Sequence, residues 1–170
     1  LEIQRYAFER KTAAEIARAP RPAVPEQLRQ DVRAALEEGR RGLDLREADE
    51  LLGILWLNDE RYVRLAPPRR VAQLVWLFAQ GRAHAGIFLH AEAPEGANER
   101  GETTVLFAVG NPPQRDFLVQ VMDVFNRLDI GVRRSFTLTL STGRQPWFLG
   151  SFQVAHRAGA ALAPDSDLFR

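Results

Sequence analysis

The sequence predicts an α+β fold of the ferredoxin-like kind, a sandwich in which helices cover one face of a four-stranded antiparallel sheet. Three observations in residues 103–154 predict it. Residues 103–109 are almost entirely apolar and include many types that favour β-strands. Apolar residues at helical spacing follow them. Residues 134–140 then alternate between apolar and hydroxyl side chains, and a further apolar strand follows a turn. A strand–helix–strand–strand unit of this size is most of such a sandwich.

Each element of this unit has its own signal. After the first strand, Asn111 can cap a helix and Pro112 suits its first position. The apolar stripe of that helix consists of Phe117, Val121, Val124, Phe125 and Leu128. The alternating strand places Phe136, Leu138 and Leu140 on one face and Ser135, Thr137 and Thr139 on the other. Turn residues at 141–144 lead into a strand whose Phe148, Phe152 and Val154 share a side.

The rest of the sandwich is expected before this unit. A ferredoxin-like sheet has the order βαββαβ, and the chain beyond Val154 lacks room for the last helix and strand. A helix at 68–80 and a strand at 84–90, which precede this unit in the chain, can take the places of the last helix and strand. A hairpin across 93–101 makes that strand antiparallel to 103–109. We therefore predict a permuted sandwich; the alternative is a truncated helix that begins at Asp165.

The first part of the chain predicts helices. One lies within 1–18, a proline linker covers 19–25, and a second helix starts at Pro25 and runs to about Gly39. A capping box from Asp44 to Glu47 opens a helix that ends near Leu57. Residues 58–65 suit a polar connection with a short extended piece, and Gly81 ends the helix at 68–80. The expected division is a helical segment at 1–58 and a sandwich domain at 59–170.

Composition excludes several classes of protein. The chain has 170 residues, 45% of them apolar, with 23 Lys and Arg against 22 Asp and Glu. A near-neutral chain lacks the basic face of a nucleic-acid binder. The absence of cysteine excludes disulfides and thiol chemistry and fits the cytoplasm. No apolar run is long enough to span a membrane, and no signal peptide is visible. A start without methionine and an end like a first helical turn suggest a piece of a longer protein.

Two short stretches are candidates for effector binding. Gly110, Asn111 and Gln114 surround the expected helix start, where free N–H groups and the helix dipole favour an anion such as a carboxylate. Arg133 and Arg134 follow on the next strand, and one of them can point across to this loop and hold the carboxylate. The alternatives are an ordinary strand-to-helix turn and a solvated strand end.

No stretch predicts catalysis or a metal. His84 and His90 share a strand face but lie about 20 Å apart at strand rise, and His156 is remote in sequence. Phe136, Phe148 and Phe152 alternate with hydroxyl residues, so they are more simply core residues than a base-stacking platform. The chain contains no phosphate-binding, dinucleotide, nucleophile-elbow or zinc-protease motif. We expect no catalytic, cofactor or metal residue.

Four segments carry a resemblance to a known family. They read FAVGNPP at 107–113, VFNRL at 124–128, LTLSTG at 138–143 and FLGSF at 148–152. Here the chain resembles the N-terminal, non-catalytic region of large NAD-dependent glutamate dehydrogenases and looks like an ACT-type regulatory domain. Tyr62, Val63 and Arg64, with Pro67 and Pro68, also look like the lead-in to ACT repeats of nitrogen-regulatory uridylyltransferases. The resemblance covers about 61–167.

The resemblance implies a regulatory or assembly domain of a cytoplasmic, homo-oligomeric enzyme that converts glutamate to 2-oxoglutarate with NAD. NAD belongs to that parent enzyme, because this chain has no dinucleotide fingerprint. ACT domains bind an amino acid at the first strand-to-helix loop, which corresponds to 110–114. Here Pro113 and Gln114 stand where the family has Pro-Gly, so close backbone approach to a ligand is harder. The alternatives are a uridylyltransferase sensor and an interaction domain without a ligand.

Overall fold

A computed structural model describes residues 23–39, 41–92, 102–113, 116–142 and 145–156. The expectations for 1–18, for the hairpin loop at 93–101 and for a helix from Asp165 lie outside these residues. The helices are α2 (Glu26–Glu38), α3 (Leu45–Asn58), α4 (Glu60–Leu65), α5 (Pro68–Ala83) and α6 (Phe117–Arg127). The strands are β1 (Ile87–Glu92), β2 (Thr103–Gly110), β3 (Ile130–Ser141) and β4 (Pro146–His156).

The strands form one four-stranded sheet in the order β1-β2-β4-β3. Every neighbouring pair is antiparallel, and β1 lies at the edge beside β2. The α+β class and the four-stranded antiparallel sheet predicted from the sequence are thereby confirmed. The strand order is compatible with a permuted ferredoxin-like sheet, in which the early strand takes the place of the last one.

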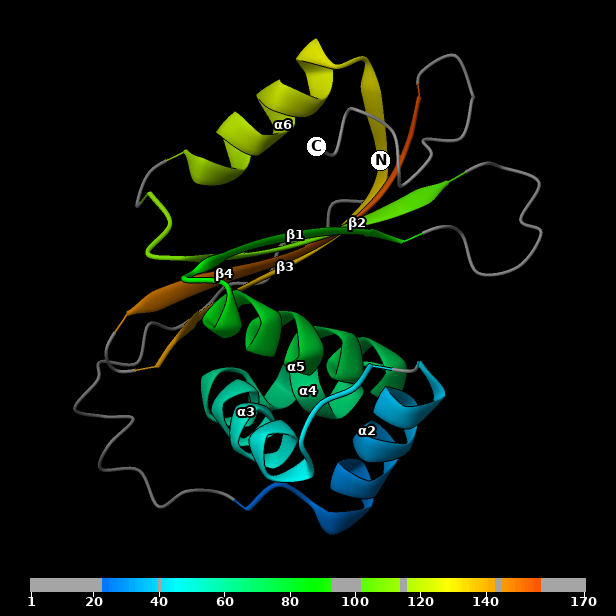
Figure 1. The fold of residues 1–170 in the computed structure, drawn as a ribbon, viewed down its shortest axis with the longest axis vertical. Coiled ribbons are helices and arrows are strands. Elements are labelled where there is room, and N and C mark those ends of the chain that lie inside the picture. Colours follow the sequence, from blue (N-terminus) through cyan, green and yellow to red (C-terminus); the bar gives the residue numbers. More distant parts are fainter. Residues whose placement is uncertain (1–22, 40, 93–101, 114–115, 143–144, 157–170) are drawn as a thin grey trace.

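The helices lie on both faces of the sheet rather than on one. Helix α6 covers one face, and α2 to α5 lie beyond the opposite face, which we call the α5 face (Figure 1). Two separate core clusters agree with this arrangement. The connection β2–α6–β3 is a crossover between parallel strands. Such crossovers are right-handed, which fixes the face of the sheet that α6 covers. Helix α5 precedes β1 and belongs to no such crossover, so this rule does not place it beside α6.

Aromatic side chains fill the core under α6. Phe152 is fully buried, and its ring lies 4.9 Å from Phe107 and 5.6 Å from Phe125, centroid to centroid. The helix begins at Phe117, after Asp116, so the expected start at Asn111 and Pro112 is wrong. Asn111 has a left-handed φ of 53° and donates its N–H to the carbonyl of Pro146 at 2.9 Å. This bond keeps Asn111 with the sheet instead of the helix.

On the α5 face, helix α5 approaches the sheet closely at Gly81. A Cβ at this position would lie 2.7 Å from the Cβ of Ala108 and 2.8 Å from the ring of Trp147. Gly81 is therefore an interior helix residue that permits contact, and the prediction that it ends the helix is wrong. The turn to β1 comes later, at Ala85 and Gly86, which both have positive φ. Strand β1 accordingly starts at Ile87, beyond the expected residue 84.

The helical layer is tied to the end of the sheet by Asn58, the last residue of α3. Its Nδ2 donates to the carbonyl of Ser141 at 3.0 Å, and its Oδ1 accepts from the N–H of Ser141 at 2.8 Å. The next residues form α4, not the expected extended piece, because Asp59 accepts from the N–H of Tyr62 and Val63 is buried. The predicted cap at Asp44 is confirmed by bonds from the N–H groups of Arg46 and Glu47.

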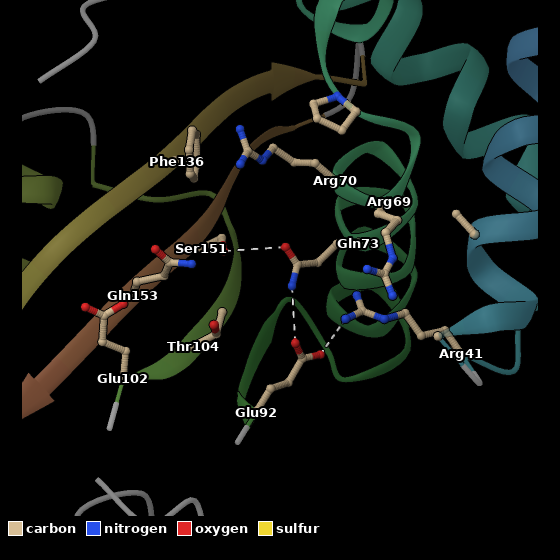
Figure 2. Close-up of a pocket in the computed structure, with 13 residues that line it drawn as sticks. Arg41, Arg69, Arg70, Gln73, Glu92, Glu102, Thr104, Phe136, Ser151 and Gln153 are labelled. Carbon is tan, nitrogen blue, oxygen red and sulfur yellow. Dashed lines mark hydrogen bonds and ion pairs between the residues drawn. The ribbon is translucent and has the colours of Figure 1, made fainter. Parts of the chain in front are cut away.

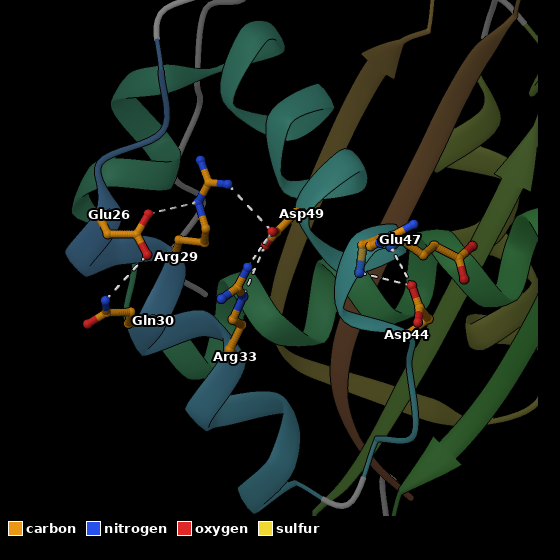
Figure 3. A network of polar contacts seen from close by, with 8 residues as sticks. Glu26, Arg29, Gln30, Arg33, Asp44, Glu47 and Asp49 are labelled. Carbon is orange, nitrogen blue, oxygen red and sulfur yellow. Dashed lines mark hydrogen bonds and ion pairs between the residues drawn. The ribbon is translucent and has the colours of Figure 1, made fainter.

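An ion-pair network joins α2 to α3 (Figure 3). Asp49 accepts from Nε of Arg33 at 3.2 Å and lies 3.5 Å from Nη1 of Arg29. This hydrogen bond from Arg33 to Asp49 raises the pKa of Arg33 above its usual value. Helices α2 to α5 and the sheet share one core cluster that runs from Val32 to Leu149, across the expected boundary at residue 58. None of the described helices is long and apolar enough to cross a membrane.

Candidate ligand pocket

A row of polar side chains crosses one end of the sheet. Glu92 of β1 lies opposite Thr104 of β2, which lies opposite Gln153 of β4, which lies opposite Arg134 of β3. Residues that are directly opposite on neighbouring strands share a face. Because Thr104 alternates with Leu106 and Ala108, which pack under the helices, this row lies on the α5 face.

A bulge in β3 brings Arg134 to that face. Val132 pairs with Val154 and Arg134 pairs with Gln153, so Arg133 is an extra residue between them. Val132 packs into the core under α6. Without the extra residue, Val132 and Arg134 would point to the same side, since residues two apart share a strand face. The bulge therefore reverses the alternation and puts Arg134 on the same side as Phe136.

Three residues of this row, Glu92, Thr104 and Gln153, belong to the floor of an open pocket of about 380 Å³ (Figure 2). Helix α5 and the loop before it provide one wall through Pro67, Arg69, Arg70 and Gln73. The end of α2 and the residues after it provide a further side. The sheet contributes Glu92, Thr104, Phe136, Ser151 and Gln153, and Glu102 stands just before β2. The pocket thus lies where the helical layer and the sheet separate.

A chain of contacts fixes the inner part of the pocket. The Nη2 atom of Arg41 lies 2.6 Å from a carboxylate oxygen of Glu92, and the guanidinium stands over the ring of Trp76. Gln73 donates to the other Glu92 oxygen at 3.2 Å and accepts from the hydroxyl of Ser151 at 3.5 Å. These contacts connect the residues after α2, helix α5 and two strands. The charges of Arg41 and Glu92 are therefore already balanced.

Two charged groups in the pocket lack a partner of opposite charge among the described residues. The guanidinium of Arg70 lies over the ring of Phe136 at 3.5 Å and forms no ion pair there. Glu102 is half-buried and has no hydrogen-bond or ion-pair partner in the described part of the chain. Arg69, by contrast, lies 3.6 Å from Glu38. Among the described residues, the pocket therefore offers one cation and one carboxylate without an ion-pair partner, together with several amides and hydroxyls.

The polar groups described in this pocket can recognise a ligand by hydrogen bonds and charge. The hydroxyl of Ser151 contacts the amide of Gln73, not a histidine or carboxylate that could remove its proton. Within the residues that the structure describes, no three side chains gather that could hold a metal ion. Small polar ligands are recognised by a few converging groups of the kind present here.

The structure separates the residues that the sequence singled out for effector binding. Gly110 and Asn111 lie at the end of β2 opposite Trp147, whereas Arg134 is in register with Thr104. Six residues of strand correspond to about 20 Å. One small ligand therefore cannot contact both groups. Asn111 is exposed, with its amide 3.3 Å from Oε1 of Gln145. Gln114 lies outside the described residues.

Of the two arginines, only Arg134 is in register with a pocket residue, Gln153, although Arg134 is itself exposed and does not line the pocket. Arg133 is the extra residue of the bulge and is exposed. Sequence patterns did not single out the pocket residues Arg70, Gln73, Glu92 and Glu102. Their signal was weak: Arg70 and Gln73 are three apart on one helix face, and Glu92 continues the face of Phe88 and His90.

Two expectations about aromatic groups are corrected. Phe136 is not a core residue like Phe148 and Phe152, because it is half-buried and borders the pocket on the α5 face. His84 and His90 are much closer than strand spacing implies, since their rings lie 5.0 Å and 6.1 Å from that of Phe88, centroid to centroid. The reason is that His84 follows α5 directly and precedes the strand.

Comparisons with known proteins identify no relative: no family model matches the chain, and no curated protein matches it.

Proposed function

We propose that this chain is a non-catalytic regulatory domain of a large, cytoplasmic, homo-oligomeric NAD-dependent glutamate dehydrogenase, and that it binds a small amino-acid-like effector in the pocket at Ser151. The resemblance of residues 107–152 to that family and the compatible fold class support the proposal. NAD would be bound by other parts of the parent enzyme. The rest of that enzyme and further copies of the chain would be its partners.

The position of the pocket is the observation that carries the proposal. Its walls come from the helical layer and its floor from the sheet, and Gln73 contacts both Glu92 and Ser151. A ligand in this place would hold the two layers in one relative position. Differential binding of this kind is what an effector needs in order to shift a conformational equilibrium.

The first test is thermal unfolding of the chain with a panel of amino acids and organic acids. Binding stabilises the folded state by RT ln(1 + [L]/Kd), which is about 2.7 kcal/mol at a hundredfold excess over Kd. Gln73→Ala should reduce the shift, because Gln73 lies in the pocket wall. Asn111→Ala is the matched control at the other end of the sheet and should leave the shift unchanged.

The opposite result is a thermal shift that is lost in Asn111→Ala and kept in Gln73→Ala. It would mean that the effector binds at the strand-to-helix loop and not in the pocket. The parent enzyme is tested by the sequence of the gene beyond residue 170. A dehydrogenase core supports the proposal, whereas a nucleotidyltransferase motif would make the chain a sensor of a nitrogen-regulatory uridylyltransferase.

A specific observation favours a second candidate, a protein-interaction domain without a ligand. Large apolar side chains are exposed on β1 and α6: Ile87 is 70% exposed, Leu89 50%, Val119 64% and Val124 52%. Exposed apolar groups that gather on one side of a protein often mark an interface. The absence of any thermal shift, together with self-association in sedimentation, would favour this candidate over effector binding.

A further inference from the structure

We infer that Arg70 and Arg134 form a clamp for a carboxylate beside Phe136, and that Glu102 selects a ligand whose other end carries an ammonium group. The inference rests on the proposed effector pocket and specifies what enters it. The ligand class is a short aliphatic acid with a terminal amine. No residue of the strand-to-helix loop takes part.

The clamp follows from the geometry of β3. Phe136 is two residues after Arg134 on the same strand face, and the guanidinium of Arg70 stands 3.5 Å from the Phe136 ring centroid. Arg70 therefore covers this ring from the helix side, and Arg134 lies on the same face of β3, opposite the pocket residue Gln153. Neither has an acidic partner among the described residues.

Two guanidinium groups around an aromatic ring suit a carboxylate. Arginine binds planar carboxylates through two parallel hydrogen bonds, and stacking on an aromatic ring holds the guanidinium plane in place. Arg70 is already half-buried and stacked, so it loses little side-chain freedom on binding. The bulge at Arg133 is the feature that places Arg134 on this face of the sheet, and bulges elsewhere re-aim side chains in the same way.

The opposite end of the pocket is negative. Glu102 belongs to the β2 side of the pocket, and β3 is two strand spacings away, or about 10 Å between backbones. Its carboxylate would repel a second negative group and attract an ammonium group. Between the two ends, Ser151 and Gln153 offer a hydroxyl and an amide. A five-carbon chain with opposite charges at its ends matches this order of groups.

The test is a calorimetric titration of the whole chain with four compounds that each contain five carbon atoms. They are δ-aminovalerate, valerate, glutarate and δ-aminovaleramide. We expect δ-aminovalerate to bind most tightly. Glutarate should be weaker because Glu102 repels its second carboxylate, and δ-aminovaleramide should be weaker because it lacks the group that the clamp holds.

Three variants test which residues contact the carboxylate end and which contact the ammonium end of the ligand. Arg70→Gln and Arg134→Gln should each weaken binding of δ-aminovalerate by about tenfold or more, since a charge-assisted pair is lost. Arg127→Gln is the control, because Arg127 is exposed on α6, on the other side of the sheet. Glu102→Gln should remove the preference for δ-aminovalerate over glutarate.

Unchanged affinity in Arg134→Gln would overturn the clamp, and equal affinity for glutarate and δ-aminovalerate in the parent chain would overturn the role of Glu102. These failures are distinct from failure of the proposed function. An effector from the wider panel that stabilises the chain through Gln73 but ignores Arg70 and Arg134 would refute the clamp and keep the pocket. A chain that binds no compound in either experiment would refute both.

Discussion

The two faces of the sheet change from apolar to polar in different directions. On the face under α6, the change runs across the strands: central residues such as Phe107 and Phe152 are buried, whereas Ser135 and Thr139 on the edge strand β3 are exposed. On the α5 face, the change runs along the strands, from buried Leu149 to Gln153 within β4.

The difference follows from what covers each face. A single amphipathic helix lies over the central strands, so the edges of the α6 face are left to solvent or a partner (Figure 1). The helical layer on the other face packs against one end of the sheet, at Gly81, and leaves the far end open. A face that is covered at one end only can provide both a core and a binding pocket.

Phe152→Ala should have the largest effect on stability. The side chain is fully buried and contacts two other phenylalanines, so truncation should destabilise the fold by about 3–5 kcal/mol. Phe136→Ala is the matched control on the α5 face, where the ring is only half-buried, and the loss should be clearly smaller. Urea denaturation measures both variants, and equal losses would contradict the contrast between the faces.

Gly81→Val should destabilise the chain by about 1–3 kcal/mol, because the added atoms collide with Ala108 and Trp147. Gly53→Ala provides the opposite case within the helical layer. Nothing lies within 4 Å of a Cβ at Gly53, and alanine favours a helix by about 0.5–1 kcal/mol over glycine. Thermal unfolding should therefore move down for the first variant and up for the second. A neutral Gly81→Val would mean that α5 can move away from the sheet.

Asn58→Ala should have the smallest effect of the three, a loss of about 1–2 kcal/mol, because Ser141 loses its two partners on the side chain of Asn58. Hydrogen exchange at the end of β3 provides the sharper measurement. Exchange at Ser141 should become faster while exchange in the α6 core stays unchanged. Faster exchange throughout the sheet would show that this contact supports the whole fold and not one end of it.

Local patterns predicted most of the elements. Alternation assigned Leu138 and Leu140 to one face of β3, and both are buried there. Asp44 marked a helix start correctly because its carboxylate accepts from nearby N–H groups. Gly81 was misread because a glycine that ends a helix and a glycine that permits close packing look alike in sequence.

The candidate site was much harder to predict. Asn111 and Arg134 looked like partners, but the strand register places them at opposite ends of the sheet. Arg70 and Glu102 are remote from each other in sequence and carry no motif. Their common pocket exists only because β1, β2 and β4 are neighbours under α5.

The sequence by itself determined, for every described element except α4, whether the segment becomes a strand or a helix and, for most of them, which side chains share a face. These properties depend on the spacing at which apolar and polar residues repeat over a short stretch of sequence. Only the tertiary structure decided which side of the sheet α5 covers, where the extra residue Arg133 falls and which charged groups remain unpaired. Those outcomes depend on pairing between residues far apart in the chain, and a local period carries no information about such pairing.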